Sequence, residues 1–88
     1  MRDEQYYVYI LYSESGDRYY KGMSQNPERR LEFHNTKERG YTSRYRPWKL
    51  VYTKGFQSKT DALAAERKVK GWRNRVMIER LIAGDIEL

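Results

Sequence analysis

The chain has 88 residues, of which 39% are hydrophobic and 34% charged, and its 18 Lys and Arg outnumber 12 Asp and Glu to give a net charge of +6. This length predicts a single domain over residues 1–88. The chain has no cysteine and only one histidine. These counts exclude disulfide scaffolds, thiol nucleophiles, zinc ribbons and sites that need several histidines.

No segment has the pattern of a membrane span. The longest apolar run covers residues 6–12, whereas a transmembrane helix needs roughly 20 apolar residues. The residues before this run show no signal-peptide pattern. We therefore expect a cytoplasmic protein without membrane contact.

The excess positive charge belongs to the second half of the chain. Residues 1–40 hold seven basic and seven acidic side chains, whereas residues 41–88 hold eleven and five. Such a one-sided basic excess is typical of proteins that bind nucleic acid, since each neutralised phosphate releases counterions. A basic surface that only keeps the protein soluble has the same composition.

The first half of the chain predicts a β-hairpin. Residues 6–13 are aromatic and β-branched, as strands prefer. Residues 14–17 have turn composition, and residues 18–23 read as the returning strand.

A helix and a third strand are expected next. Asn26 and Pro27 are a typical helix start, and this helix is predicted to end near His34. A polar, basic loop is expected over residues 35–47. Residues 48–56 again have the composition of a strand.

Two further helices complete the predicted order β-β-α-β-α-α. Ser58 is a candidate N-cap for a helix that runs to Lys70 and ends at Gly71. The last helix is expected over residues 75–83. Its predicted apolar side consists of Val76, Met77, Leu81 and Ile82.

Alternation along the hairpin places two tyrosines on one face. A two- or four-residue turn puts Tyr9 opposite Gly22 and Leu11 opposite Tyr20, so both phenols lie on the same side of the strands. The missing side chain of Gly22 leaves a gap beside them. The two phenols therefore either line a pocket or form ordinary cross-strand packing.

Arg30 and His34 lie four residues apart and share one helix face. A guanidinium binds phosphate through two hydrogen bonds, and an imidazole that titrates near neutral pH moves protons. These two side chains are therefore candidates for a phosphate site. The alternative for His34 is an ordinary surface or capping residue.

Glu66 interrupts the apolar side of its helix, where its neighbours are Ala62, Leu63 and Val69. Burying a carboxylate is costly unless it meets a cation. One Mg²⁺, which takes few protein carboxylates and keeps its waters, satisfies this requirement. So does an ordinary ion pair with Lys70, four residues further along the helix.

Basic side chains surround the third strand and follow Glu66, interleaved with aromatic residues. Such mixtures suit contact with a nucleic-acid backbone and stacking on its bases, although Trp48 could equally turn inward. The candidate nucleic-acid contacts are Lys21, Arg44, Arg46, Lys49, Lys68, Lys70, Arg73 and Arg75.

In order and spacing these motifs resemble the GIY-YIG nuclease family, especially its small stand-alone members. The likeness covers residues 6 to about 75. It rests on Tyr7-Val8-Tyr9, Tyr20-Lys21-Gly22, Asn26-Pro27-Glu28-Arg29-Arg30, His34 and Glu66. The resemblance implies an α+β fold, with a three-stranded antiparallel sheet flanked by helices, and metal-dependent cleavage of nucleic-acid phosphodiesters. The sequence leaves DNA and RNA open as substrates, and we expect DNA before RNA.

By resemblance, five of these motif residues take catalytic roles, and Gly22 is a structural residue of the site. Glu66 would hold one Mg²⁺ or Mn²⁺, and Arg30 would contact the scissile phosphate. Tyr9 and Tyr20 would position or deprotonate the attacking water, with the choice of base left open, and His34 would assist proton movement or anchor the phosphate. A chain of this length leaves no separate recognition domain, so low sequence specificity or recognition of nucleic-acid structure is expected.

Three positions depart from the family pattern. Tyr7 replaces the first glycine, Lys21 replaces the middle isoleucine of the second motif, and Met23 stands where several relatives have lysine. Alternation predicts that Lys21 points away from Tyr20. These departures motivate an alternative, a non-catalytic nucleic-acid-binding module on the same fold. A protein-interaction domain is a third hypothesis.

Overall fold

Strand β1 is the centre of the fold because both of its faces carry apolar side chains. A computed structural model describes residues 5–88. Residues 1–4, where the sequence shows no signal-peptide pattern, lie outside the described part of the chain. The elements in chain order are β1 (Tyr6–Ser13), β2 (Arg18–Ser24), α1 (Pro27–Thr36), the 3₁₀ helix η1 (Tyr41–Tyr45), β3 (Trp48–Phe56), α2 (Lys59–Lys70) and α3 (Arg75–Ala83).

The three strands form one antiparallel sheet in the order β2-β1-β3, which confirms the predicted fold class. Val8 and Ile10 point to one face of β1, and Tyr9 and Leu11 point to the other. All four are at most 1% exposed. The long apolar run of the sequence is therefore a central strand that helices cover on both faces.

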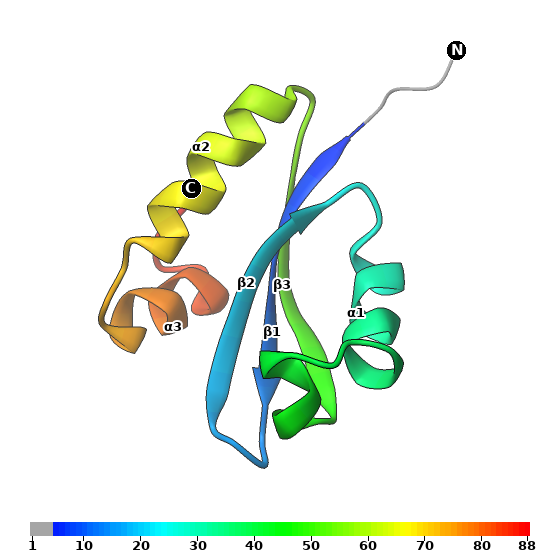
Figure 1. The fold of residues 1–88 in the computed structure, drawn as a ribbon. Helices are drawn as coiled ribbons and strands as arrows, with labels where there is room; N and C mark the ends of the chain where they lie inside the picture. Colours follow the sequence, from blue (N-terminus) through cyan, green and yellow to red (C-terminus); the bar gives the residue numbers. More distant parts are fainter. Residues whose placement is uncertain (1–4) are drawn as a thin grey trace.

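Helices α2 and α3 cover the face of the sheet that carries Val8 and Ile10 (Figure 1). Ile78 and Leu81 of α3 are buried in this layer, whereas Val76 is 50% exposed. The predicted apolar side of α3 was therefore wrong for Val76 and lacked Ile78. Residues two positions apart lie on nearly opposite sides of a helix, so burying Ile78 turns Val76 toward solvent.

Helix α1 and the 3₁₀ helix η1 cover the other face (Figure 1). The predicted loop over residues 35–47 was wrong in two respects, because α1 continues to Thr36 and η1 forms within that stretch. The Asn35 side chain does not end the helix. It accepts a hydrogen bond from the Trp48 backbone N–H at 2.7 Å and donates one to the Trp48 carbonyl at 3.1 Å. Asn35 therefore attaches α1 to β3.

A bulge in β3 lets this strand contribute buried side chains to the layers on both faces of the sheet. Ile10 pairs with Tyr52 whereas Leu11 pairs with Leu50, so one extra residue lies between the two pairs. As a result Trp48 and Leu50 pack with the α1 layer and Tyr52 packs with the α2 layer. Trp48 is 2% exposed, so of the two orientations considered for it, the inward one is correct.

The predicted helix starts are confirmed by their caps. The Asn26, Ser58 and Asn74 side chains each accept a hydrogen bond from a backbone N–H in the first turn of α1, α2 and α3. No helix within residues 5–88 is long and apolar enough to cross a membrane. The cytoplasmic location stays a prediction.

Candidate active site

Tyr9 lies on the α1 side of the sheet with its phenol over Gly22 of β2. The two residues are direct cross-strand partners, and a Cβ atom at Gly22 would lie 2.7 Å from the Tyr9 hydroxyl oxygen. The gap predicted beside the tyrosines is therefore filled by the Tyr9 ring rather than open as a pocket. Tyr20 pairs with Leu11, as the alternation predicted, and its ring centroid lies 6.4 Å from that of Tyr9.

His34 is buried between the sheet and η1 and is not a surface residue. Its side chain belongs to α1, and the residue is 1% exposed. Nε2 lies 3.1 Å from the Tyr9 hydroxyl, and Nδ1 lies 3.1 Å from Oγ1 of Thr42 in η1. The Tyr20 ring packs beside the imidazole with 4.6 Å between centroids. The imidazole therefore connects the tyrosine pair to η1.

The environment of His34 favours its neutral form. Burial lowers the His34 pKa below its ordinary value of 6.5, and the positive charges of Arg30 and Arg46 lower it further, against a smaller opposing effect of Glu38. The imidazole is therefore neutral at pH 7. A neutral imidazole has one N–H and one nitrogen that accepts a hydrogen bond, so it can take up a proton.

Tyr9 is held as a neutral phenol by the same burial. Burial raises the Tyr9 pKa, as do the neighbouring Tyr20 and the negative charge of Glu66. Arg30 acts in the opposite direction, because its positive charge favours the phenolate. Tyr9 therefore contacts a proton acceptor, His34, and is also influenced by the positive charge of Arg30.

Arg30 lies at the boundary between this buried pair and solvent. The residue is half-buried, and its guanidinium stacks over the Phe33 ring at 4.5 Å from the centroid. A surface depression of about 470 Å³ opens beside it, lined by Arg29, Arg30, Glu32, Phe33, Thr36 and Lys37. A phosphate that enters this depression meets the Arg30 side chain.

Glu66 belongs to α2, which packs on the opposite face of the sheet from Tyr9 and His34. Its side chain is 17% exposed and forms an ion pair with Lys70 at 3.2 Å, which is the partner that the sequence offered as an alternative to a metal ion. The Glu66 charge nevertheless acts on the Tyr9 pKa. The structure therefore brings Tyr9, Tyr20 and His34 into contact. Arg30 and Glu66 act on Tyr9 through their charges, and Glu66 does so from the opposite layer.

The donor set around Glu66 fits a metal ion that keeps most of its waters. Residues 5–88 contain no group of three or more histidine, cysteine or carboxylate side chains that could enclose an ion. A single carboxylate suits Mg²⁺, which is commonly held by one or two carboxylates together with water and substrate phosphate. Lys70 is 53% exposed, and exposed ion pairs are weak, so an arriving cation could displace its ammonium group.

The candidate nucleic-acid contacts divide into two groups by their partners. Within residues 5–88, Lys21, Arg44, Lys68 and Arg73 have no ion pair, whereas four others have intramolecular partners. Those four are Arg46, Lys49, Lys70 and Arg75. The Lys49 ammonium lies 3.4 Å from the Glu14 carboxylate on the surface, where such a pair exchanges readily with solvent.

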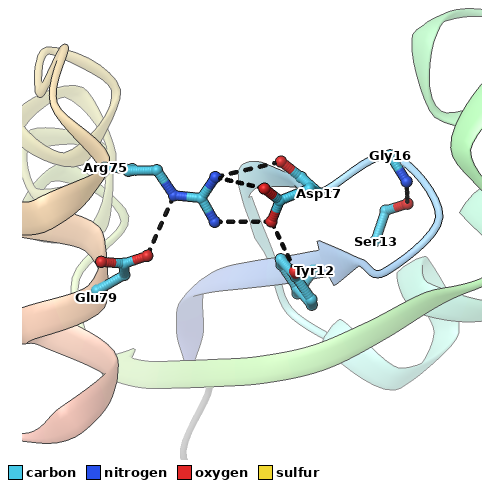
Figure 2. A network of polar contacts seen from close by, with 6 residues as sticks. All are labelled: Tyr12, Ser13, Gly16, Asp17, Arg75 and Glu79. Carbon is cyan, nitrogen blue, oxygen red and sulfur yellow. Dashed lines mark hydrogen bonds and ion pairs between the residues drawn. The ribbon is translucent and has the colours of Figure 1, made fainter.

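Arg46 and Arg75 are occupied by contacts that hold the fold together. The Arg46 guanidinium donates to the backbone carbonyls of His34, at 2.7 Å, and of Glu38. Figure 2 shows Arg75 between Asp17 of the β1–β2 turn, at 3.0 Å, and Glu79 of its own helix, at 3.1 Å. Arg75 thereby attaches the start of α3 to the hairpin.

Three unpaired or weakly paired cations gather beside β2, an edge strand of the sheet. Arg18, Lys21 and Arg73 line a depression of about 230 Å³ together with the aromatic rings of Tyr41 and Trp72. We call these five residues and the space between them the β2-edge groove. Lys21 points to this side, away from Tyr20, as alternation predicted.

Sequence reasoning missed Thr42, which touches His34, and Arg18 in the β2-edge groove. Thr42 lies eight residues from His34, a separation that no regular periodicity connects, inside a stretch expected to be a loop. The only feature of the sequence that could have pointed to Thr42 is the group of aromatic residues in and around η1. Arg18 was placed in the returning strand, but nothing in that strand alone indicates that Arg73 lies beside it.

Comparison with known proteins places the chain in a family. The model of the GIY-YIG catalytic domain matches residues 5–80, and the chain therefore belongs to the GIY-YIG family. This confirms the resemblance on which the site residues were chosen, although their individual roles stay predictions.

Small relatives match most of the chain. A UPF0213 protein of Limosilactobacillus reuteri is 34% identical over 91 residues, which cover all of this chain and 94% of that protein. The solution NMR structure of a UPF0213 protein from Bacillus halodurans covers 90% of this chain and 83% of its own, with 31% identity and a TM-score of 0.58. A homologue of the structure-specific endonuclease subunit SLX1 from Giardia intestinalis is 47% identical over 58 residues, 61% of this chain but 16% of that protein.

Replacing Gly22 by alanine is expected to displace the Tyr9 ring. The new Cβ would lie 2.7 Å from the phenol oxygen of a buried side chain, and such overpacking lowers the free energy of unfolding by about 1–3 kcal/mol. Gly71→Ala is the matched control, because its Cβ would lie 3.4 Å from the nearest atom and its φ is −77°. The control is expected to be neutral or to stabilise by about 0.4–1 kcal/mol. Equal losses for both variants in urea unfolding would contradict the close approach at Gly22.

Stability is expected to fall as the pH drops below the ordinary His34 pKa of 6.5. Because the folded-state pKa is lowered, the unfolded chain binds the proton first, so acid favours unfolding; the stabilisation is fully present above 6.5. Urea midpoints between about pH 5.5 and 7.5, above the range of most carboxylates, measure this effect. Since His34 is the only histidine, His34→Gln should remove the dependence within this window. An unchanged slope in the variant would show that another group titrates there.

Proposed function

We propose that this protein is an endonuclease that hydrolyses phosphodiester bonds in nucleic acid, DNA rather than RNA, with one Mg²⁺ or Mn²⁺. The observation that carries the proposal is the contact between the Tyr9 hydroxyl and the buried His34 imidazole, with the positive charge of Arg30 acting on the same phenol. A phenol, a neutral imidazole and a fixed cation suit proton transfer next to a phosphate. Membership of a family whose model describes a catalytic domain supports this activity.

In the proposed reaction, Tyr9 and Tyr20 position a water molecule in line with the scissile phosphate. The water gives a proton to Tyr9 while Tyr9 gives its own to His34, a bond forms from the water oxygen to phosphorus, and the bond to the leaving oxygen breaks. The leaving oxygen takes a proton from solvent, and His34 then returns its proton through Tyr9 to solvent. Arg30 contacts the phosphate and stabilises the charge that develops on it.

Glu66 is the residue that would hold the metal ion, with water and phosphate oxygens as the remaining ligands. When bound, such an ion neutralises negative charge on the phosphate. Within the chain itself, the Lys70 ammonium neutralises the same carboxylate. The binding of a cation therefore requires the Glu66–Lys70 pair to open.

The basic side chains without ion pairs are proposed to hold the substrate. The β2-edge groove combines three cations with two aromatic rings, a composition suited to a nucleic-acid backbone and its bases. The Giardia relative carries the name of a structure-specific endonuclease subunit. We therefore propose that this protein also selects its substrate by structure, with little dependence on sequence.

The Glu66–Lys70 pair also favours a second candidate function. A carboxylate that already has a cation needs no metal ion, so the chain could be a nucleic-acid-binding module without catalysis. Met23, at a position where the family pattern often has lysine, agrees with this alternative. The module would bind nucleic acid in the absence of metal and would not need Glu66.

Removing the Glu66 charge separates these two functions. For an endonuclease, Glu66→Gln is expected to lower the cleavage rate in Mg²⁺ or Mn²⁺ by about 100-fold or more, while nucleic-acid binding persists. Glu87→Gln is the matched control, because it makes the same charge change at an exposed position after α3, outside the depression beside Arg30. The assay measures nicking of single-stranded, duplex and branched DNA, and of duplex RNA, with and without metal.

Certain results of the same assay would contradict the proposal. Cleavage by Glu66→Gln at the wild-type rate would refute the metal-holding role of this residue. Metal-independent binding with no cleavage of any substrate by the wild-type protein would establish the binding module instead. Loss of cleavage in both Glu66→Gln and Glu87→Gln would indicate a nonspecific charge effect.

Removing a cation from the β2-edge groove should weaken binding without ending catalysis. Arg73→Ala is expected to reduce the slope of log affinity against log salt by about one, with the turnover rate unchanged. Lys59→Ala, at the other end of α2 (Figure 1), removes the same charge away from the groove and should leave the slope as in the wild type. Salt titrations of DNA binding measure both variants. Equal slopes for Arg73→Ala and the wild type would exclude the groove from the interface.

A further inference from the structure

Thr42 is the second hydrogen-bond partner of the buried imidazole. Its hydroxyl lies 3.1 Å from Nδ1 of His34, and the residue is 1% exposed. No side-chain oxygen or nitrogen buried within residues 5–88 lacks a hydrogen-bond partner. The Tyr9 hydroxyl, the imidazole and the Thr42 hydroxyl therefore form one continuous buried chain of hydrogen bonds.

The position of Thr42 is fixed by its own neighbours. The Trp48 indole donates a hydrogen bond to the Thr42 carbonyl at 2.8 Å, and this tryptophan is itself 2% exposed. Arg46 holds the other side of the contact, because it donates to the backbone carbonyl of His34 at 2.7 Å. Both ends of the His34–Thr42 hydrogen bond are thus anchored to β3 and to the segment that enters it.

Two arrangements of hydrogen atoms are compatible with the hydrogen bonds between Tyr9, His34 and Thr42. In the first, Tyr9 donates to Nε2 and Nδ1–H donates to Thr42. In the second, Thr42 donates to Nδ1 and Nε2–H donates to Tyr9. Only the first gives His34 a free electron pair directed at the phenolic hydrogen, because a hydrogen bond at one ring nitrogen decides which nitrogen carries the proton.

The Tyr9 hydroxyl distinguishes between the two arrangements. Within residues 5–88 its one hydrogen-bond partner is Nε2 of His34, and the residue is 1% exposed. In the second arrangement the phenol would accept from Nε2–H, and its own buried hydrogen would have no acceptor. In the first arrangement this hydrogen is donated to Nε2, so the hydroxyl is satisfied.

We propose that Thr42 is a positioning residue that accepts a hydrogen bond from Nδ1–H of His34 and thereby holds Nε2 ready to accept the Tyr9 hydrogen. The consequence for catalysis rests on the proposed function, whereas the protonation pattern of the imidazole does not. Thr42 touches neither substrate nor reacting atoms. It acts through His34, and no regular spacing in the sequence connects the two residues.

The imidazole itself reports the arrangement. Because His34 is the only histidine in the chain, the ¹⁵N resonances of its ring in a two-dimensional NMR spectrum at pH 7.5 can be assigned without ambiguity. The proposal expects a protonated Nδ1 and an unprotonated Nε2 in the wild-type protein. A protonated Nε2 with a bare Nδ1, or a doubly protonated ring, would overturn it without any variant.

Two substitutions at Thr42 test the role of its hydroxyl. Thr42→Val removes the hydroxyl and should abolish the preference for protonated Nδ1, whereas Thr42→Ser keeps the hydroxyl and should retain it. Ser43→Ala is the control, since it removes a neighbouring hydroxyl in η1 that donates to the Gly40 carbonyl. An unchanged imidazole spectrum in Thr42→Val would show that Thr42 does not set the tautomer.

Cleavage kinetics test the catalytic consequence separately. Thr42→Val is expected to lower kcat by about 10- to 100-fold with little change in KM, and Thr42→Ser should restore the rate. Equal kcat in Thr42→Val and the wild type would refute the catalytic consequence. If the wild-type protein cleaves no substrate, the proposed function fails, while the NMR measurement still decides whether Thr42 positions the imidazole.

Discussion

The rest of the candidate site depends on the close approach of the Tyr9 ring to the backbone of Gly22. A side chain at Gly22 would occupy the space of the phenol, so glycine is what allows Tyr9 to lie across β2. From this position the Tyr9 hydroxyl reaches His34 of α1, and the positive charge of Arg30 acts on the same phenol. A strand, its neighbour and a helix thus meet at one hydroxyl group.

Burial keeps the Tyr9 phenol and the His34 imidazole neutral, although the protein as a whole carries a net positive charge. The same desolvation raises the Tyr9 pKa and lowers the His34 pKa, because the charged form of each group is the one that loses hydration. Arg30 adds a positive charge that disfavours imidazolium. The outcome is a neutral donor–acceptor pair behind a fixed cation, separate from the β2-edge groove, where the cations face solvent.

The predictions from sequence held where a local rule decided the structure. Alternation along the hairpin correctly paired Tyr9 with Gly22, and the capping residue Asn26 correctly started α1. The predictions failed where a contact distant in sequence decided the structure. Asn35 was expected to lie beyond the helix, but it belongs to α1 and its side chain pairs with the backbone of Trp48. Glu66 shows the same limit, because the sequence offered Lys70 or a metal ion as its partner and could not choose between them.

By itself, the sequence determined the order of strands and helices, the register of the β1–β2 hairpin and the residues that match the family pattern, because periodicity, caps and motif spacing are local properties of the chain. Only the tertiary structure decided that His34 is buried, that Thr42 is its second partner, and that Arg46 and Arg75 bond to other segments of the chain. The physical reason is that burial and hydrogen-bond partners depend on packing between layers. A bulge in β3 and the short helix η1 set that packing, and neither has a periodic signature in the sequence.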